Sequence, residues 1–174
     1  AYLHEDDVRF AADVSFQPIL EELSELYGLR KPEAVMQPVY CSEDSAIRLL
    51  LADSVRMAVT TRPLNENEKT IVQQHNLPLL QSKLAYDAFA LIVNKQNPDT
   101  VINVNELRQI IQGKITRWEQ LEMGTKKGEL NLVFDASGSS TVRYMKDSLN
   151  GGKDLQGNIF AQGSNMKVIQ TVKE

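Results

Sequence analysis

The hydrophobic and polar positions of the chain fall into two alternating kinds of segment. Residues 8–12 form a short apolar run, which is typical of a buried strand. In residues 16–26 the apolar side chains recur at positions 16, 19, 20, 23 and 26, which is helical spacing. Pro18 suits the first turn of this helix, and Gly28 is expected to end it. The start of the chain therefore predicts a strand followed by a helix.

The order of a strand followed by a helix repeats in the next part of the chain. Strands are predicted at residues 34–40 and 54–59, with a helix over residues 42–53 between them. Asn65-x-x-Glu68 has the form of a capping box and predicts the start of another helix. Such a series predicts an α/β fold with a mainly parallel sheet covered by helices.

A second α/β series begins at the longest apolar run, residues 88–93, which we expect to be a strand. Its other predicted elements are a helix from the Asn103-x-x-Glu106 capping box to Gly113, strands at 130–134 and 158–162, and helices at 144–149 and 165–174. We therefore expect two lobes with central, mainly parallel sheets. The first spans residues 1–86 and the second residues 87–174.

Composition and charge limit the function classes. Apolar content of 42% and charged content of 24% are ordinary for a globular protein. The net charge of −4 gives no electrostatic footprint for nucleic acid, so none is expected as a partner. With one cysteine and two separated histidines, we predict neither an internal disulfide nor a zinc site, and no cofactor. No apolar run approaches the roughly 18 residues that a membrane span needs.

Residues 135–143 carry the clearest candidate chemistry. They lead from an apolar run through Gly138 and a Ser/Thr turn into a helix. Backbone N–H groups at a helix start have no partner within the helix, and the helix dipole is positive there. Ser139, Ser140 and Thr141 add hydroxyl donors, so the turn suits a small oxyanion such as phosphate. An ordinary helix N-cap is the simpler interpretation of this segment alone.

Three more strand-to-helix junctions are rich in hydroxyl residues: residues 13–16, 41–45 and 60–62. In open parallel sheets, ligands bind outside the carboxyl ends of the strands, where helix N-termini converge. A single junction of this kind is usually a plain cap. Four junctions distributed over two lobes favour an anion site.

Five segments of the chain have the form and order of known motifs. They are Ala12-Asp-Val-Ser-Phe16, Ala58-Val-Thr-Thr-Arg-Pro-Leu64, Asp87-Ala-Phe-Ala-Leu-Ile-Val-Asn94, Leu107-Arg-Gln-Ile-Ile-Gln-Gly-Lys-Ile-Thr-Arg-Trp118 and Ser139-Ser-Thr141. In these segments, the chain resembles the phosphate-binding solute receptors of bacterial ABC transporters. The fourth contains the family's Gly-Lys-Ile-Thr-x-Trp pattern, and the last lies where the family has its Ser-Gly-Thr anion loop. Ser139-Ser-Thr-Val-Arg-Tyr is most similar to the branch found in Bacteroides-like bacteria.

The resemblance implies a type II periplasmic-binding-protein fold that binds its anion in the cleft between two lobes, without catalysis. It further implies a monomeric, periplasmic or extracytoplasmic lipoprotein that serves the membrane permease of an ABC transporter. In this family the last strand and helices of the first lobe follow the second lobe. We therefore expect the first lobe to be incomplete here, as in a C-terminally truncated chain.

Carried over by position, the resemblance implies twelve ligand-binding residues. They are Ser15, Phe16, Ser42, Ser45, Thr60, Thr61, Arg62, Gly138, Ser139, Ser140, Thr141 and Arg143. Phe16 would give a backbone N–H, and either Ser42 or Ser45 the hydroxyl of the second helix. Arg62 or Arg143 would supply positive charge.

Two departures from the family leave the anion open. Well-known members have an Asp after the third strand, where this chain has Thr61, and an Arg before the anion loop, where it has Phe134 or Asp135. The Asp matters because hydrogen phosphate carries a proton that needs an acceptor, whereas sulfate needs only donors. Asp135 is a candidate for that acceptor. Sulfate or molybdate is the alternative ligand.

The alternatives to a receptor are a hydrolase and a ligand-sensing or regulatory domain. A hydrolase would use Ser139 or Ser140 with a carboxylate, but neither histidine lies near a recognised junction to act as base. A ligand-sensing or regulatory domain of the same fold stays open, because the departures from the family affect specificity. The sequence favours a non-catalytic receptor.

Overall fold

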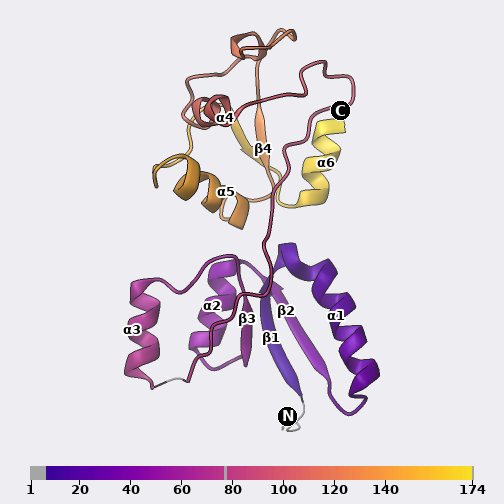
Figure 1. Cartoon of the computed structure of the whole chain (residues 1–174), viewed down its shortest axis with the longest axis vertical. Coiled ribbons are helices and arrows are strands. Elements are labelled where there is room, and N and C mark those ends of the chain that lie inside the picture. The colour runs from indigo at the N-terminus through magenta and orange to yellow at the C-terminus, as the bar shows by residue number, and fades with distance from the viewer. Residues whose placement is uncertain (1–6, 77, 174) are drawn as a thin grey trace. The chain divides into compact units, whose positions relative to one another are not determined.

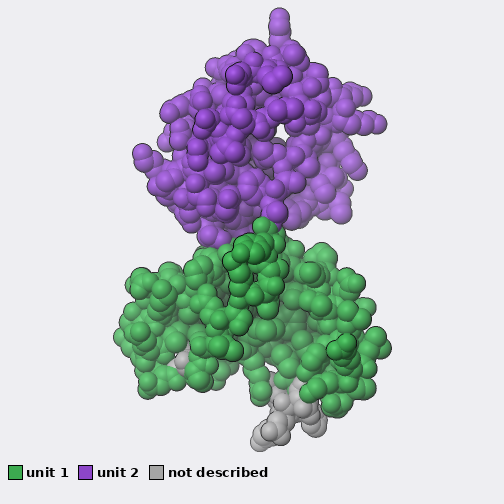
Figure 2. All heavy atoms as spheres, viewed as in Figure 1, with its two compact units in different colours: residues 1–87 green, residues 88–174 purple. Residues whose placement is uncertain are grey.

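The computed structural model describes residues 7–76 and 78–173. The chain divides into two compact units, residues 1–87 and 88–174 (Figure 2). Each unit has its own small parallel sheet, with helices packed against it (Figure 1). The predicted α/β class with parallel sheets is confirmed. Within the described residues, no helix combines the length and the apolar character that crossing a bilayer requires.

The sheet of the first unit has β1 at its centre. Its strands are β1 (Val8–Asp13), β2 (Met36–Cys41) and β3 (Met57–Val59), in the order β2-β1-β3, and all pair in parallel. Ala12 of β1 lies opposite Tyr40 on one side and Val59 on the other. The carboxyl ends of the three strands therefore lie at one edge of the sheet.

Helices cover both faces of this sheet. They are α1 (Gln17–Arg30), which follows the 3₁₀ turn η1 (Val14–Phe16), and α2 (Glu43–Leu51), whereas α3 (Glu66–Gln74) packs against α2. Successive residues of a strand point to opposite faces. Accordingly, Phe10 packs with Leu20 of α1, whereas Ala11 packs with Ala46 of α2. Burial on both faces explains the continuous apolar run from Phe10 to Ala12 in β1.

The predicted end of α1 at Gly28 is wrong, because the helix continues to Arg30. A Cβ added to Gly28 would meet no atom within 4 Å, so nothing there requires glycine. The C-cap is Lys31, which directly precedes Pro32. A residue before proline is disfavoured in the helical conformation, so Pro32 accounts for the stop.

The predicted strand at residues 88–93 is also wrong. The segment is extended and belongs to no ladder among the described residues, and its apolar side chains are exposed, with Ile92 48% accessible. A strand needs a partner for its N–H and C=O groups, and an apolar run in the sequence does not supply one. The segment is anchored at its end by Asn94, whose side-chain amide donates to the carbonyls of Val172 and Lys173.

The second unit is built on β4 (Leu132–Phe134) and β5 (Ile159–Ala161), which pair in parallel. Its other elements are α4 (Val104–Ile111), the 3₁₀ turn η2 (Trp118–Gln120), α5 (Ser140–Tyr144), the π-helical turn η3 (Met145–Leu149) and α6 (Asn165–Lys173). The predicted last helix is thus confirmed to Lys173, and Glu174 lies outside the described residues. The buried core of the second unit has two clusters. One consists of Leu107, Ile111, Phe134 and Met145, and the other of Ile110, Ile115, Leu121 and Leu130.

Two glycines allow the end of α4 to approach the segment before β5. Gly113 has φ +70° and Gly157 has φ +99°, a region that favours glycine. A Cβ on Gly157 would lie 3.1 Å from the Ile110 carbonyl oxygen and from the Gly113 Cα. Next to this contact, the Gln156 N–H donates to the Ile111 carbonyl at 2.8 Å. The Gly of the Gly-Lys-Ile-Thr-x-Trp pattern therefore serves close backbone packing.

Candidate functional site

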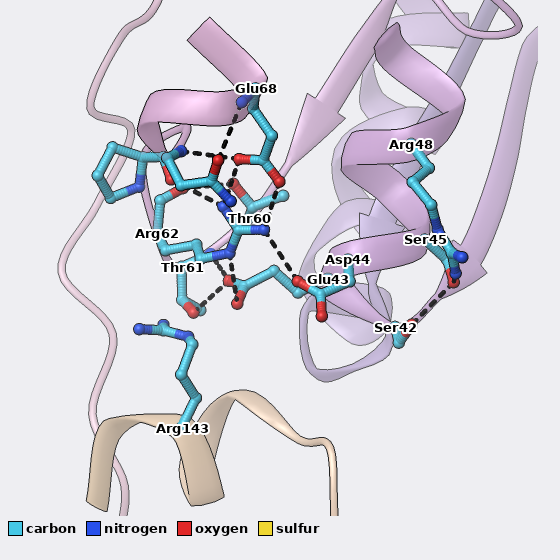
Figure 3. Close-up of polar contacts among 12 residues, drawn as sticks. Ser42, Glu43, Asp44, Ser45, Arg48, Thr60, Thr61, Arg62, Glu68 and Arg143 are labelled. Atoms are coloured by element: carbon cyan, nitrogen blue, oxygen red, sulfur yellow. Dashed lines mark hydrogen bonds and ion pairs between the residues drawn. The ribbon is translucent and has the colours of Figure 1, made fainter. Parts of the chain in front are cut away.

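Three of the predicted junctions meet at the carboxyl edge of the first unit's sheet. They follow β1, β2 and β3, whose parallel register brings their ends together. Ligands of open α/β sheets bind at such an edge. The polar contacts around the β2 and β3 junctions are drawn in Figure 3.

At the β1 junction a buried carboxylate holds Ser15. Asp13, 5% exposed, accepts hydrogen bonds from the Ser15 N–H at 3.0 Å and from the Ser15 hydroxyl at 2.7 Å, both at Oδ1. Asp13 is thereby the N-cap of η1. Phe16 is half-buried and packs against the cluster that contains Phe10 and Leu20. Both predicted residues of this junction follow the central strand directly.

At the β2 junction the two alternative serines contact each other. The Ser42 hydroxyl donates to Ser45 Oγ at 2.9 Å, and Arg48 Nη2 donates to the same oxygen at 2.9 Å (Figure 3). Ser42 is the N-cap residue of α2 by backbone conformation, but its side chain makes no capping hydrogen bond. The first turn of α2 therefore presents a linked pair of hydroxyls.

At the β3 junction both donors of Thr61 are directed at Glu43. The Thr61 N–H lies 2.7 Å and its hydroxyl 2.6 Å from Glu43 Oε1 (Figure 3). Glu43 is the first residue of α2 and is 4% exposed. The neighbouring Thr60 hydroxyl donates to the Arg62 carbonyl at 2.9 Å. Glu43 is not among the residues predicted from the sequence, and the available signal was an acidic residue directly after Ser42, the N-cap residue of α2.

Arg62 is surrounded by carboxylates. Its Nη1 and Nη2 lie 2.8 Å from the two oxygens of Glu68, Nη2 lies 2.9 Å from Asp44, and Nε lies 3.7 Å from Glu43. Nη1 also donates to the Pro63 carbonyl at 3.0 Å. The hydrogen bond to Glu68 is the main cause of a pKa of Arg62 above its ordinary value. The side chain is 14% exposed, so Arg62 is largely shielded from water.

The junction of the second unit has Ser139 as the N-cap of α5. Ser139 Oγ accepts from the Val142 N–H at 3.3 Å, and the Ser139 N–H donates to the Ala136 carbonyl at 3.2 Å. Ser140 and Thr141 are the first residues of α5 and are half-buried, whereas Gly138 is exposed. Helix-start N–H groups have no partner within the helix. The N-cap interpretation of Ser139 is confirmed, and it leaves the junction rich in donors.

Arg143 and Asp135 flank this junction on either side. Arg143 Nη1 lies 3.8 Å from Asp147, one turn further along the helical segment. The Asp135 carbonyl accepts from the Gly163 N–H, which fixes the end of β4 to the loop after β5. In the part of the chain that the structure describes, no group of three His, Cys, Asp or Glu residues has metal-binding geometry.

Comparisons with known proteins cover nearly the whole chain. A family model described as a PBP superfamily domain matches residues 4–172. The phosphate-binding protein PstS of Staphylococcus aureus is 23% identical over 141 residues, which are 80% of this chain and 43% of that protein. The chain thus spans less than half the length of the curated relatives it matches.

Solved structures of two phosphate receptors are similar to this chain in fold. An ABC-type phosphate transport receptor from Vibrio cholerae is 25% identical with a TM-score of 0.69, covering 95% of this chain and 66% of that one. A putative phosphate ABC transporter substrate-binding protein with bound phosphate, from Clostridium perfringens, is 23% identical with a TM-score of 0.80, covering 96% and 67%.

Proposed function

Because the chain belongs to the PBP superfamily, we propose that the protein is a phosphate-binding solute receptor of an ABC transporter. The predicted type II periplasmic-binding-protein-like fold is confirmed by the similarity to the solved receptors. In this proposal the receptor acts as an extracytoplasmic, lipid-anchored monomer that passes its anion to a membrane permease. Two of the similar proteins are named as phosphate-binding or phosphate-transport proteins, which supports the proposal.

The Ser139 junction is the observation on which the proposal rests. Behind the Ser139 cap, the first N–H groups of α5 and the hydroxyls of Ser140 and Thr141 form a compact set of neutral donors. Several neutral donors and a helix start suit an oxyanion. Since the net charge of the chain is −4, attraction of an anion has to come from such local dipoles.

The proposed mechanism is binding without chemistry. Hydroxyl and N–H donors at the start of α5, from Ser139 to Thr141, replace the water around the anion. Nothing in the described residues favours the hydrolase alternative. His75 is the C-cap of α3, at the opposite end of that helix from the β3 junction, and His4 lies outside the described residues.

Calorimetric titration of the protein with phosphate, sulfate and molybdate tests the proposal. We expect saturable heat from phosphate and much weaker binding of the other two anions. Heat from sulfate or molybdate alone would make the protein a receptor for another oxyanion. Heat from none of the three would contradict an oxyanion receptor.

A further inference from the structure

A mostly apolar pocket, here called the β5 pocket, borders β5 in the second unit. Its volume is about 280 Å³, and its wall includes Phe134 of β4, Val142 of α5, Leu155 and Ile159 of β5. Phe134 is 5% exposed, and the other three residues pack against the core cluster to which it belongs. Ala161, an exposed residue of β5, also lines the pocket. The β5 pocket therefore reaches from the surface of the unit to its core.

The size of the β5 pocket limits what can fill it. A buried water molecule needs about three polar partners, which an apolar wall does not offer, whereas an apolar cavity of about 150 Å³ is large enough to bind benzene. A stable protein partner would have to cover about 800 Å² of surface on each side. A pocket of about 280 Å³ is too small for that. Its volume instead suits a small organic molecule with one ring or a branched chain.

The polar groups of the pocket determine which charge such a molecule should carry. Lys146 and Asp154 both line the pocket, and Lys146 Nζ lies 2.7 Å from Asp154 Oδ1. The Asp154 side chain is 89% exposed, whereas that of Lys146 is 40% exposed, so the ammonium group is the more shielded partner. An ammonium group has three donors, and ion pairs with such an exposed partner are weak. A carboxylate in the pocket can therefore join Asp154 at Lys146 or replace it.

We propose that the β5 pocket binds a small carboxylic acid whose apolar body is an aromatic ring or a branched chain. The body packs against Phe134, Leu155 and Ile159. The carboxylate accepts hydrogen bonds from Lys146 Nζ, and Ser137, which also lines the pocket, has a hydroxyl that can donate to it. The site goes beyond the proposed function and does not rest on it, because an anion without an apolar body gains nothing from this wall.

Amide NMR during titration of the protein with phenylacetate and with 3-methylbutanoate tests the site. We expect saturating shifts of the Leu155 and Ile159 amides, with one dissociation constant for each acid, and no shift of Leu29 in the first unit. The same titrations in excess phosphate should give the same constants. Loss of acid binding in phosphate would place the acid at the Ser139 junction and overturn the proposal. Absence of a saturating shift with both acids would overturn it as well.

Two substitutions separate the apolar wall from the charge. Ala161→Phe fills the pocket and should abolish binding of both acids. Lys146→Met keeps a long side chain without the charge and should weaken phenylacetate about tenfold. Benzyl alcohol, a neutral ring of similar size, should bind the wild type about tenfold more weakly than phenylacetate, and the two should bind Lys146→Met alike. Lys167→Met, at an exposed position of α6, is the matched control with wild-type affinities.

Thermal melts identify variants that do not fold, and if Ala161→Phe does not fold, the comparison of Lys146→Met with Lys167→Met decides alone. Acid binding by folded Ala161→Phe would place the site elsewhere and overturn the proposal. Equal phenylacetate affinity of the two lysine variants would overturn it too, since the carboxylate would then not be recognised by Lys146. Wild-type binding of benzyl alcohol as tight as that of phenylacetate would contradict a site for acids.

Discussion

Arg62 and Glu68 form a bidentate ion pair, in which Arg62 Nη1 lies 2.8 Å from Glu68 Oε2 and Arg62 Nη2 lies 2.8 Å from Glu68 Oε1. Glu68 Oε2 also accepts from the Asn65 N–H at 2.7 Å, which closes the capping box of α3. A single carboxylate thus joins the loop after β3 to the start of the next helix. Both side chains are about 15% exposed or less, so water screens the pair weakly.

The Arg62–Glu68 pair predicts a pH-dependent contribution to stability. The hydrogen bond from Arg62 is the main reason why the pKa of Glu68 lies below its ordinary 4.5. A lowered pKa means that the stabilisation is complete above about pH 4.5 and is lost as the pH falls through the lower value. Glu68→Gln should therefore cost about 2 kcal/mol at pH 7. In melts between pH 7 and 3, its deficit against the wild type should shrink below pH 4.5.

Glu66→Gln is the matched control for this measurement. Glu66 is 88% exposed and pairs with Lys69 one turn away on the same helix. Such a surface pair contributes about 0.5 kcal/mol or less. An equal effect of both substitutions, or a Glu68→Gln deficit that does not change with pH, would show that the Arg62 fork is not a stabilising ion pair.

Gly28→Ala should stabilise the first unit. Gly28 lies inside α1, and a Cβ there would meet no atom within 4 Å. Alanine in a helix interior is favoured over glycine by about 0.5–1 kcal/mol because glycine loses more backbone entropy on folding. Chemical denaturation should show a higher midpoint with an unchanged slope. A lower midpoint would mean that the helix needs glycine there after all.

Gly157→Ala should destabilise the second unit. The substitution would place a Cβ 3.1 Å from the Ile110 carbonyl oxygen, at a φ of +99°. Strained backbone of this kind costs on the order of 1–3 kcal/mol. Gly128→Ala is the control, because Gly128 also has a positive φ but open space around it. If both variants lose the same stability, the close approach to α4 contributes nothing beyond backbone strain.

Ser139→Ala separates the two roles of the second unit's junction. Loss of the N-cap hydrogen bond to Val142 should cost about 1 kcal/mol of stability. Loss of a hydroxyl donor should also weaken phosphate binding about tenfold. Ser148→Ala, at an exposed position of η3, should change neither quantity. A stability loss with unchanged phosphate affinity would show that Ser139 is only a cap.

Features that depend on residues close in the sequence were predictable, whereas the specific contacts of residues far apart in the sequence were not. The capping boxes at Asn65 and Asn103 formed as expected, because each depends on residues three positions apart. The apolar run at residues 88–93 predicted a strand, but a ladder needs a partner that the run itself does not specify. Glu43 was not predicted as a site residue for the same reason. Its contact with Thr61 joins residues 18 positions apart and depends on the adjacency of α2 and the end of β3.

The central claim is that the N–H groups at the start of α5 bind a phosphate ion. The most direct measurement is amide NMR of the protein during titration with phosphate. We predict saturating shifts of the Ser140 and Thr141 amides with one dissociation constant, and no shift of Leu29 near the far end of α1. Saturable phosphate binding that leaves the Ser140 and Thr141 amides unshifted would contradict the account.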